Sequence, residues 1–312
     1  MQNAIDAWNG HYQPLLEAKA IRPGNEPQLM IHQGEHPAAN SIVLVHGLTD
    51  SPFLMRAVGK SFSDMGFNVL MPLMPAHGLQ QPEEKMDRVK VKEWQDEVSF
   101  AVQCAHELGQ KVSIGGLSNG GALSLHKAIT SPKEITGGVF LFSAALDIGD
   151  FLEHLLRSNS TILSYVLEAG EEIMEAKKGS LVKEDNPYRY SWIPQNGAKQ
   201  LAELIGQIEG HYHRLKKPKY SDISQPVFAA HSESDQAASI EEIELLMKNH
   251  PGGKGKTEFF RMKKKFAVAH ASVVLADNIY SPITGEAQEG KNIFFDDMMM
   301  RAAEFAKKHL GG

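Results

Sequence analysis

Uninterrupted apolar runs alternate along the chain with segments in which apolar residues recur at helical spacing. Residues 41–46 form the first clear run, which stops at Gly47. A continuous apolar run of this length is typical of a strand that is buried on both faces of a parallel sheet. Similar runs predict further strands at residues 67–74, around Val112, and at residues 135–145, 226–231 and 256–262.

The segments between these runs have the spacing of amphipathic helices. Residues 53–65 follow Pro52, which suits the first position of a helix, and stop at Gly66. The same spacing predicts helices at residues 91–108, 122–129, 239–250 and 295–309. Strands that alternate with helices in this way predict right-handed βαβ crossovers around one central, mostly parallel sheet.

Two polar stretches stand outside this alternation. The first 40 residues are polar and carry four prolines, and a short strand is predicted among them at residues 28–32. Residues 76–91 are also polar and predict a loop between the second strand and the next helix.

The alternation stops at residue 148 and resumes near residue 223. In between, apolar spacing predicts helices at residues 151–157, 162–176 and 197–212, with no strand among them. We interpret residues 148–222 as a helical cap inserted over the edge of the sheet. Residues 1–147 and 223–312 then form the α/β core.

Composition narrows the functional classes. The 312 residues are 42% hydrophobic and 22% charged, as in ordinary globular proteins, and the formal net charge is −6. A net negative charge argues against nucleic acid as a partner, because duplex binding normally needs a basic surface. The single cysteine, Cys104, rules out an internal disulfide framework and is expected in a buried helix.

The beginning of the sequence lacks the basic and apolar regions of a signal peptide. No apolar run approaches the ~18 residues that a membrane-spanning helix needs. From these observations we expect a cytoplasmic protein without stable membrane insertion.

The most informative motif is Gly116-Leu117-Ser118-Asn119-Gly120, which has the form G-x-S-x-G. A predicted strand enters the motif and a predicted helix leaves it. This arrangement is typical of a nucleophile elbow, a turn so sharp that the serine hydroxyl projects from the sheet. Glycines flank the serine because the neighbouring backbone comes too close for a side chain. The motif predicts Ser118 as a nucleophile.

A serine hydroxyl needs a general base, and the base needs an orienting acid. In the fold that carries this elbow, the chain order is serine, acid, histidine. Asp235 follows the predicted strand at residues 226–231, and His270 follows the last predicted strand. Since parallel strands end at one edge of the sheet, we expect Ser118, Asp235 and His270 to meet there.

Alternatives exist for both partners. Glu233 lies two residues before Asp235, and Asp147 follows the fourth strand, where some hydrolases carry their acid. The chain has other histidines near strand or helix ends, but they are less well placed than His270: His231, His250 and His309.

Acyl transfer also requires two backbone N–H groups that stabilise the oxyanion. One is expected from Asn119, directly after the nucleophile. The other is expected from Leu48, in the loop after the first buried strand. His46 and His77 are interpreted as structural residues that brace this loop and the neighbouring turn.

Taken together, these segments resemble the α/β-hydrolase superfamily, and more narrowly its carboxylesterase and monoacylglycerol-lipase branch. The resemblance rests on residues 43–50, residues 71–78 and the elbow, together with Asp235 and His270. It implies an eight-stranded, mostly parallel sheet under a helical cap. Two departures from the branch stand out, namely an asparagine at position 119 and a long segment at residues 273–292 that we expect to shape the pocket.

The predicted reaction is hydrolysis of a small-molecule carboxylic ester, either a short- to medium-chain acyl ester or a monoacylglycerol, through an acyl-enzyme on Ser118. Amide, peptide or thioester hydrolysis by the same triad is an alternative. A catalytically silent hydrolase fold that serves as a binding protein is another, for which a broken triad is expected. No H-E-x-x-H motif and no phosphate-binding loop occur, so no metal or other cofactor is expected.

Overall fold

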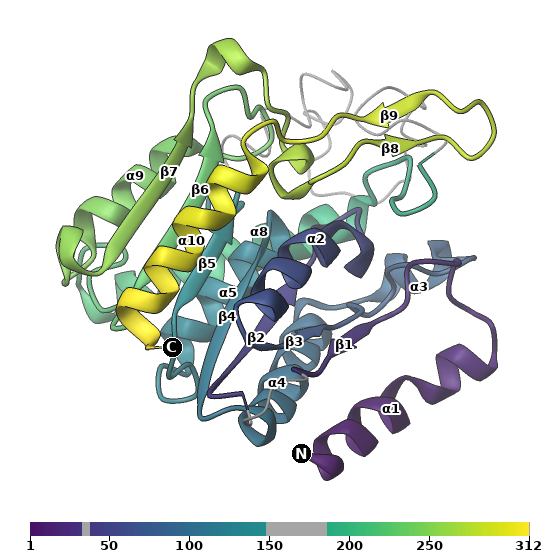
Figure 1. Ribbon diagram of the computed structural model, residues 1–312, viewed down its shortest axis with the longest axis horizontal. Helices are drawn as coiled ribbons and strands as arrows, with labels where there is room; N and C mark the ends of the chain where they lie inside the picture. The colour runs from purple at the N-terminus through teal and green to yellow at the C-terminus, as the bar shows by residue number, and fades with distance from the viewer. Residues whose placement is uncertain (33–37, 148–185, 312) are drawn as a thin grey trace.

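The computed structural model describes residues 1–32, 38–147 and 186–311. Within them, seven strands form one sheet in the order β1-β3-β2-β4-β5-β6-β7 (Figure 1). All neighbours are parallel except β1, which runs antiparallel to β3. The strands are β1 (Gln28–Met30), β2 (Asn40–Val45), β3 (Asn68–Met71), β4 (Lys111–Leu117), β5 (Val139–Phe142), β6 (Val227–Ser232) and β7 (Thr257–Met262).

Helices cover both faces of the sheet (Figure 1). Helices α2 and α10 lie on one face, and α4, α5, α8 and α9 lie on the other, with α1 outside α4. The helices of the described residues are α1 (Gln2–Glu17), α2 (Pro52–Asp64), α3 (Glu83–Arg88), α4 (Val91–Leu108), α5 (Asn119–Thr130), α8 (Gln195–Leu215), α9 (Ile240–Asn249) and α10 (Phe295–Leu310).

Strand β2 shows why its sequence is apolar throughout. Ile42 and Leu44 pack into the cluster under α2 and α10, whereas Val43 and Val45 pack into the cluster on the opposite face. Because alternate side chains of a strand point to opposite faces, a strand covered on both sides buries every residue. This confirms the prediction of a central parallel sheet, and Cys104 is buried in α4 as expected.

Both polar stretches contain a helix that was not predicted. Residues 2–17 form helix α1, which buries Ala4, Trp8 and Tyr12 at a spacing of four residues. Trp8 stacks on Phe100 of α4 with ring centroids 6.2 Å apart, so packing against α4 stabilises a helix that even contains Pro14. The predicted loop at residues 76–91 contains the short helix α3.

The sheet also differs in detail from the eight strands that the resemblance implied. The described residues supply seven, because only β1 precedes β2 in the chain. The long segment at residues 273–292 contains a two-stranded hairpin, made of β8 (Ile279–Tyr280) and β9 (Ala287–Glu289).

The predicted cap falls largely outside the described residues, which include neither of its first two predicted helices, 151–157 and 162–176. The third is α8, and it packs against α3, α4 and α5. Its buried residues belong to the same apolar cluster as the sheet's residues on that face: Leu201, Leu204, Ile205, Ile208 and Tyr212. The boundaries of the cap stay a prediction.

Candidate active site

The chain turns sharply at Ser118. Strand β4 ends at Leu117 and helix α5 begins at Asn119, so a single residue makes the turn. Ser118 has φ 53° and ψ −117°, a conformation that a residue with a side chain adopts only under strain. A Cβ on Gly120 would overlap the backbone carbonyl of Val45 in the neighbouring strand, which explains the glycine. This is the geometry of a nucleophile elbow.

His270 and Asp235 are brought together across 35 residues of sequence. The Nδ1 atom of His270 lies 2.7 Å from Oδ2 of Asp235. Asp235 lies in the turn after β6, and its Oδ1 accepts hydrogen bonds from the backbone N–H groups of Ala237 (2.8 Å) and Ala238 (3.1 Å). The carboxylate is therefore fixed on one side by backbone and offers its other oxygen to the histidine.

The charges of this pair are coupled. Burial alone would raise the pKa of Asp235, but the attraction of His270, its hydrogen bond and the nearby His231 lower it to about 2. Burial would lower the pKa of His270, and the Asp235 carboxylate outweighs this effect, so the net pKa of His270 is raised above 6.5. The arrangement favours an ionised Asp235 beside a histidine that readily takes a proton.

Of the alternative residues, Glu233 contacts other side chains, whereas His231 lies close to Asp235. Glu233 pairs with Arg261, whose Nε lies 2.6 Å from its Oε1. His231 is fully buried, and its Nε2 lies 3.5 Å from Oδ2 of Asp235. From the sequence, His231 was considered less well placed than His270. Its position on β6, four residues before Asp235, was the signal that could have identified this contact.

The loop between β2 and α2, residues 46–51, is braced by two buried histidines. Met74 donates its backbone N–H to Nε2 of His46 (3.1 Å), so the proton of His46 is on Nδ1, 2.9 Å from the carbonyl of Gly47. Burial and His77 lower the pKa of His46 to about 3. Nε2 of His77 lies 2.7 Å from the carbonyl of Leu48. Both histidines have the structural role predicted for them.

Asn119 has two features that bear on chemistry. As the first residue of α5, its backbone N–H has no acceptor within the helix. Its side chain is completely buried, and neither atom of its amide has a hydrogen-bond partner among the described residues. A buried amide without partners is unfavourable by ~1–3 kcal/mol.

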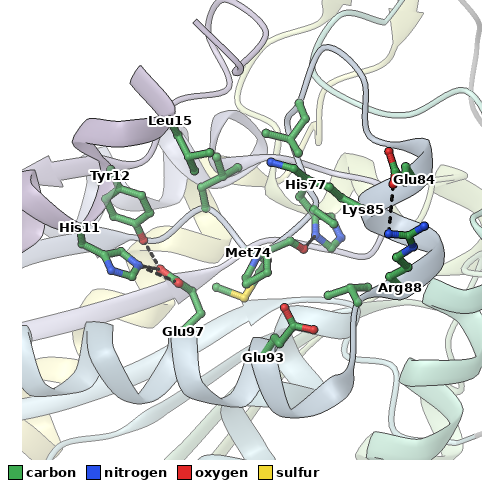
Figure 2. Close-up of a pocket in the computed structure, with 15 residues that line it drawn as sticks. His11, Tyr12, Leu15, Met74, His77, Glu84, Lys85, Arg88, Glu93 and Glu97 are labelled. Atoms are coloured by element: carbon green, nitrogen blue, oxygen red, sulfur yellow. Dashed lines mark hydrogen bonds and ion pairs between the residues drawn. The ribbon is translucent and has the colours of Figure 1, made fainter. Parts of the chain in front are cut away.

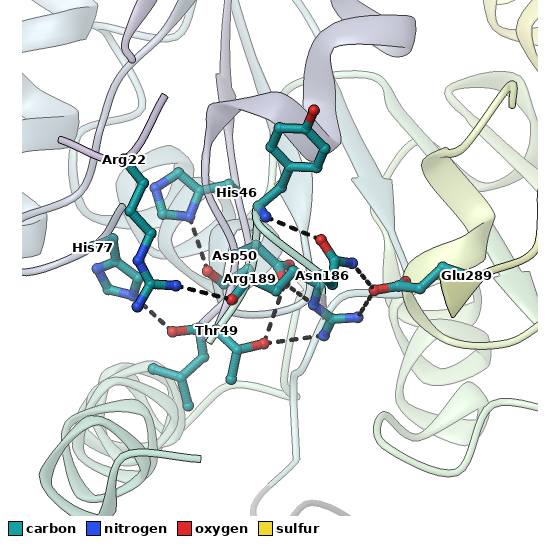
Figure 3. A network of polar contacts seen from close by, with 11 residues as sticks. Arg22, His46, Thr49, Asp50, His77, Asn186, Arg189 and Glu289 are labelled. Atoms are coloured by element: carbon teal, nitrogen blue, oxygen red, sulfur yellow. Dashed lines mark hydrogen bonds and ion pairs between the residues drawn. The ribbon is translucent and has the colours of Figure 1, made fainter. Parts of the chain in front are cut away.

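A buried ionic network lies beside these residues and was not predicted from sequence. Arg189 places its Nε 2.7 Å from Oδ1 of Asp50 and its Nη1 2.8 Å from Oε1 of Glu289 (Figure 3). The three residues come from the β2–α2 loop, from the segment before α8 and from β9. No local sequence pattern marks such a contact, because its members are about 100 or more residues apart.

A cavity of about 530 Å³ lies at some remove, between α1, α3, α4 and the loop after β3. None of Ser118, Asp235 and His270 lines it. At one end Tyr12 and His11 point toward the buried carboxylate of Glu97, and both bind it (Figure 2). The cavity is thus separate from the elbow.

Within the ranges that the structure describes, no three metal-ligating side chains cluster together, and no helix is both long and apolar enough to cross a membrane. What the described geometry offers is serine, histidine and carboxylate chemistry at the carboxyl edge of the sheet.

Comparison with known proteins identifies the family. Residues 36–260 match the family model Hydrolase_4, described as serine aminopeptidase, S33. A thermostable monoacylglycerol lipase from Bacillus sp. (strain H-257) is 27% identical over 177 residues, which are 57% of this chain. The match spans 66% of that relative's length, slightly under two thirds.

Solved structures share the fold along most of the chain. A structure from work on the metagenome-derived lipolytic enzymes LipS and LipT matches with a TM-score of 0.65 at 19% identity, covering 93% of this chain and 100% of that one. A soluble variant of Saccharomyces cerevisiae monoglyceride lipase matches with a TM-score of 0.63 at 12% identity, covering 91% of each chain.

A monoacylglycerol lipase from Paleococcus ferrophilus matches with a TM-score of 0.56 at 16% identity, covering 91% of this chain and 98% of that one. At these identities the likeness establishes the fold alone. The family match, which covers more than half of the chain, goes further. The proteins that resemble this chain in sequence and structure include lipases and esterases. The protein belongs to the Hydrolase_4 family of α/β-hydrolases.

Proposed function

We propose that the protein is a serine esterase that hydrolyses short- to medium-chain acyl esters or monoacylglycerols through an acyl-enzyme on Ser118. The observation that carries this proposal is the hydrogen bond between His270 and Asp235 at the edge of the sheet where the strained Ser118 turn also lies. A strained turn, a paired histidine and a buried carboxylate are the parts that nucleophilic acyl transfer requires.

In the proposed reaction, Oγ of Ser118 attacks the ester carbonyl carbon and Nε2 of His270 accepts the hydroxyl proton. Nδ1–H of His270 donates to Asp235, which fixes the tautomer and stabilises the imidazolium that forms. His270 then gives the proton to the leaving alcohol. In the second half of the reaction, His270 accepts a proton from a water molecule that attacks the acyl-enzyme. It then returns this proton to Oγ of Ser118 as the carboxylic acid is released.

Two backbone donors, the N–H groups of Asn119 and Leu48, are proposed to stabilise the negative charge that develops on the carbonyl oxygen. Asn119 suits this role because its N–H has no acceptor within α5. The N–H of Leu48 makes no hydrogen bond to another part of the described backbone, which leaves it free for an oxyanion. Donors held in advance of the reaction stabilise the transition state without reorganisation.

The substrate class is supported by the relatives. The Bacillus relative is named a monoacylglycerol lipase, and two of the matched structures are monoacylglycerol or monoglyceride lipases. The family description, serine aminopeptidase, is the reason to retain amide hydrolysis as the second candidate. Both reactions use the same nucleophile, so substrate profiling has to separate them.

The test is hydrolysis of p-nitrophenyl esters from acetate to palmitate and of monoacylglycerols, beside an aminoacyl p-nitroanilide. We expect ester turnover that Ser118→Ala abolishes, together with fluorophosphonate labelling of the wild type. Turnover of the anilide alone would favour the aminopeptidase reaction. A wild type that neither turns over nor labels would favour a silent binding protein.

A further inference from the structure

Arg189 is buried between two carboxylates. Its side chain is 11% exposed, and the side chains of Asp50 and Glu289 are 3% and 12% exposed. Asn186 also donates to Oε1 of Glu289, at 2.7 Å. Two acidic side chains thus share one basic side chain in a place that is largely shielded from water, where a charge without a partner is unfavourable.

The same guanidinium fastens the β2–α2 loop. Nη2 of Arg189 donates to Oγ1 of Thr49 at 3.0 Å, and Oγ1 of Thr49 in turn donates to Oδ1 of Asp50 at 3.2 Å (Figure 3). The backbone N–H of Tyr190 donates to the carbonyl of Thr49 at 2.8 Å. Two consecutive residues of the loop, directly after Leu48, are therefore held by Arg189 and its neighbour.

The network also lies close to the proposed reacting groups. A Cβ placed on Gly47 would lie 3.5 Å from Cβ of Ser118 and would overlap Oδ2 of Asp50. Ser118 and the Asp50 carboxylate therefore both lie next to Gly47 in the loop. The charges of Arg189 and Asp50 both act on His270, Arg189 lowering its pKa and Asp50 raising it.

Fold stability is a poor explanation for such an arrangement. Well-packed apolar residues in place of a buried ion pair are often neutral or even stabilising. Oxyanion donors, by contrast, have to be held close to their productive geometry, and a displacement of about 1 Å can lower a rate by ~100-fold. A rigid, directional guanidinium that binds both Thr49 and Asp50 meets this need.

We propose that Arg189 is a positioning residue of the esterase site, which holds the β2–α2 loop through Thr49 and Asp50 so that the Leu48 N–H points at the developing oxyanion. Glu289 anchors the guanidinium from the far side. This inference rests on the proposed function. It concerns the transition state, because a positioned oxyanion donor binds the tetrahedral species more strongly than the substrate.

The experiment compares the wild type with Arg189→Met and Thr49→Val on p-nitrophenyl butyrate. Arg189→Met is expected to lower kcat by ~100-fold with KM changed less than about 3-fold, since the lost interaction serves the transition state. Thr49→Val removes only the hydroxyl that Arg189 binds in the loop and leaves the direct ion pair of Arg189 with Asp50, so its kcat is expected to fall by ~10-fold. Arg301→Met is the matched control, because Arg301 is half exposed and pairs with Glu258.

A second readout reports on the oxyanion itself. The inhibition constant of an alkyl trifluoromethyl ketone, whose adduct with a serine carries an oxyanion, is expected to rise in parallel with the loss of kcat/KM in Arg189→Met. A purely structural role would not link these two quantities. Circular dichroism and thermal unfolding test whether each variant is folded. If Arg189→Met does not fold, the kinetics of Thr49→Val test the positioning role instead.

The outcomes are distinct. A folded Arg189→Met with wild-type kcat, a rise in KM alone, or an unchanged inhibition constant would overturn the positioning role. If Arg189→Met does not fold, wild-type kinetics in Thr49→Val would overturn it equally. A wild type that neither hydrolyses esters nor reacts with fluorophosphonate would overturn the proposed function, and this inference with it.

Discussion

Exchange of Asp235 for asparagine is the sharpest test of the proposed triad. Oδ1 of Asp235 accepts from two backbone N–H groups, and in Asp235→Asn the amide oxygen would take over this role. The amide nitrogen would then face Nδ1 of His270, at the position of the oxygen that now lies 2.7 Å away. Because that nitrogen donates, Nδ1 would have to accept, and the proton of His270 would move to Nε2, where Ser118 needs an acceptor.

The magnitude follows from the same pair. Lowering the pKa of Asp235 from 3.8 to about 2 corresponds to ~2 kcal/mol in favour of the carboxylate, at about 1.36 kcal/mol per pKa unit. That interaction is lost in Asp235→Asn, and the wrong tautomer adds to the loss. Replacement of the orienting aspartate of a Ser-His-Asp triad by asparagine lowers kcat by ~10⁴-fold, and we expect a loss of about this size here.

The assay is the initial rate on p-nitrophenyl butyrate as a function of pH. His270 must be neutral to accept the proton, and its pKa is raised above 6.5 by Asp235 against the effect of burial. Activity of the wild type should therefore decline as the pH falls through this raised pKa. In Asp235→Asn burial is no longer opposed by the carboxylate, so the decline should move to lower pH.

Glu233→Gln is the matched control, a carboxylate-to-amide exchange two residues away. Glu233 pairs with Arg261 and Lys263 rather than with His270, so this variant should retain wild-type kcat. The assignment of Asp235 would be refuted if Asp235→Asn kept more than about a tenth of the activity, or if Glu233→Gln lost as much.

Three further expectations concern stability and packing. Asn119→Leu, a replacement of similar shape, should raise the free energy of unfolding by ~1–3 kcal/mol in urea titrations, because it removes a buried amide without described partners; a lower free energy of unfolding would contradict this. Gly120→Ala should lower the thermal midpoint and the activity together, since its Cβ would overlap the carbonyl of Val45; an unchanged midpoint would contradict this contact. Tyr12→Phe should lower the free energy of unfolding by ~1–3 kcal/mol, as it removes a donor from the buried Glu97 carboxylate, and unaltered urea unfolding would argue against that bond.

Much of the core fold could be predicted because its signals are local. The apolar run at β2 predicts a strand buried on both faces, and the structure shows why, with alternate residues entering different clusters. The helix at α1 was missed although Ala4, Trp8 and Tyr12 recur at helical spacing, because its polar residues and Pro14 favoured an irregular segment. Its stability depends on contacts of Trp8 and Tyr12 with α4, which lie far away in the sequence.

The candidate site divides in the same way. The Ser118 turn is encoded by neighbouring glycines, and the order of Asp235 and His270 along the chain follows from where parallel strands end. The choice of Asp235 over Glu233 was a prediction from spacing, whereas their different contacts are visible only in the folded turn. Glu233 binds Arg261, and Asp235 binds His270.

The sequence by itself determined the parallel sheet, the sharp serine turn and the residues expected to carry the chemistry, because each is written in a short stretch of chain. Only the tertiary structure decided that Arg189, Asp50 and Glu289 meet beside that turn. The physical reason is that a buried charged side chain is stable only beside a side chain of opposite charge. Arg189, Asp50 and Glu289 come from segments that lie far apart in the sequence, and only the fold brings them together.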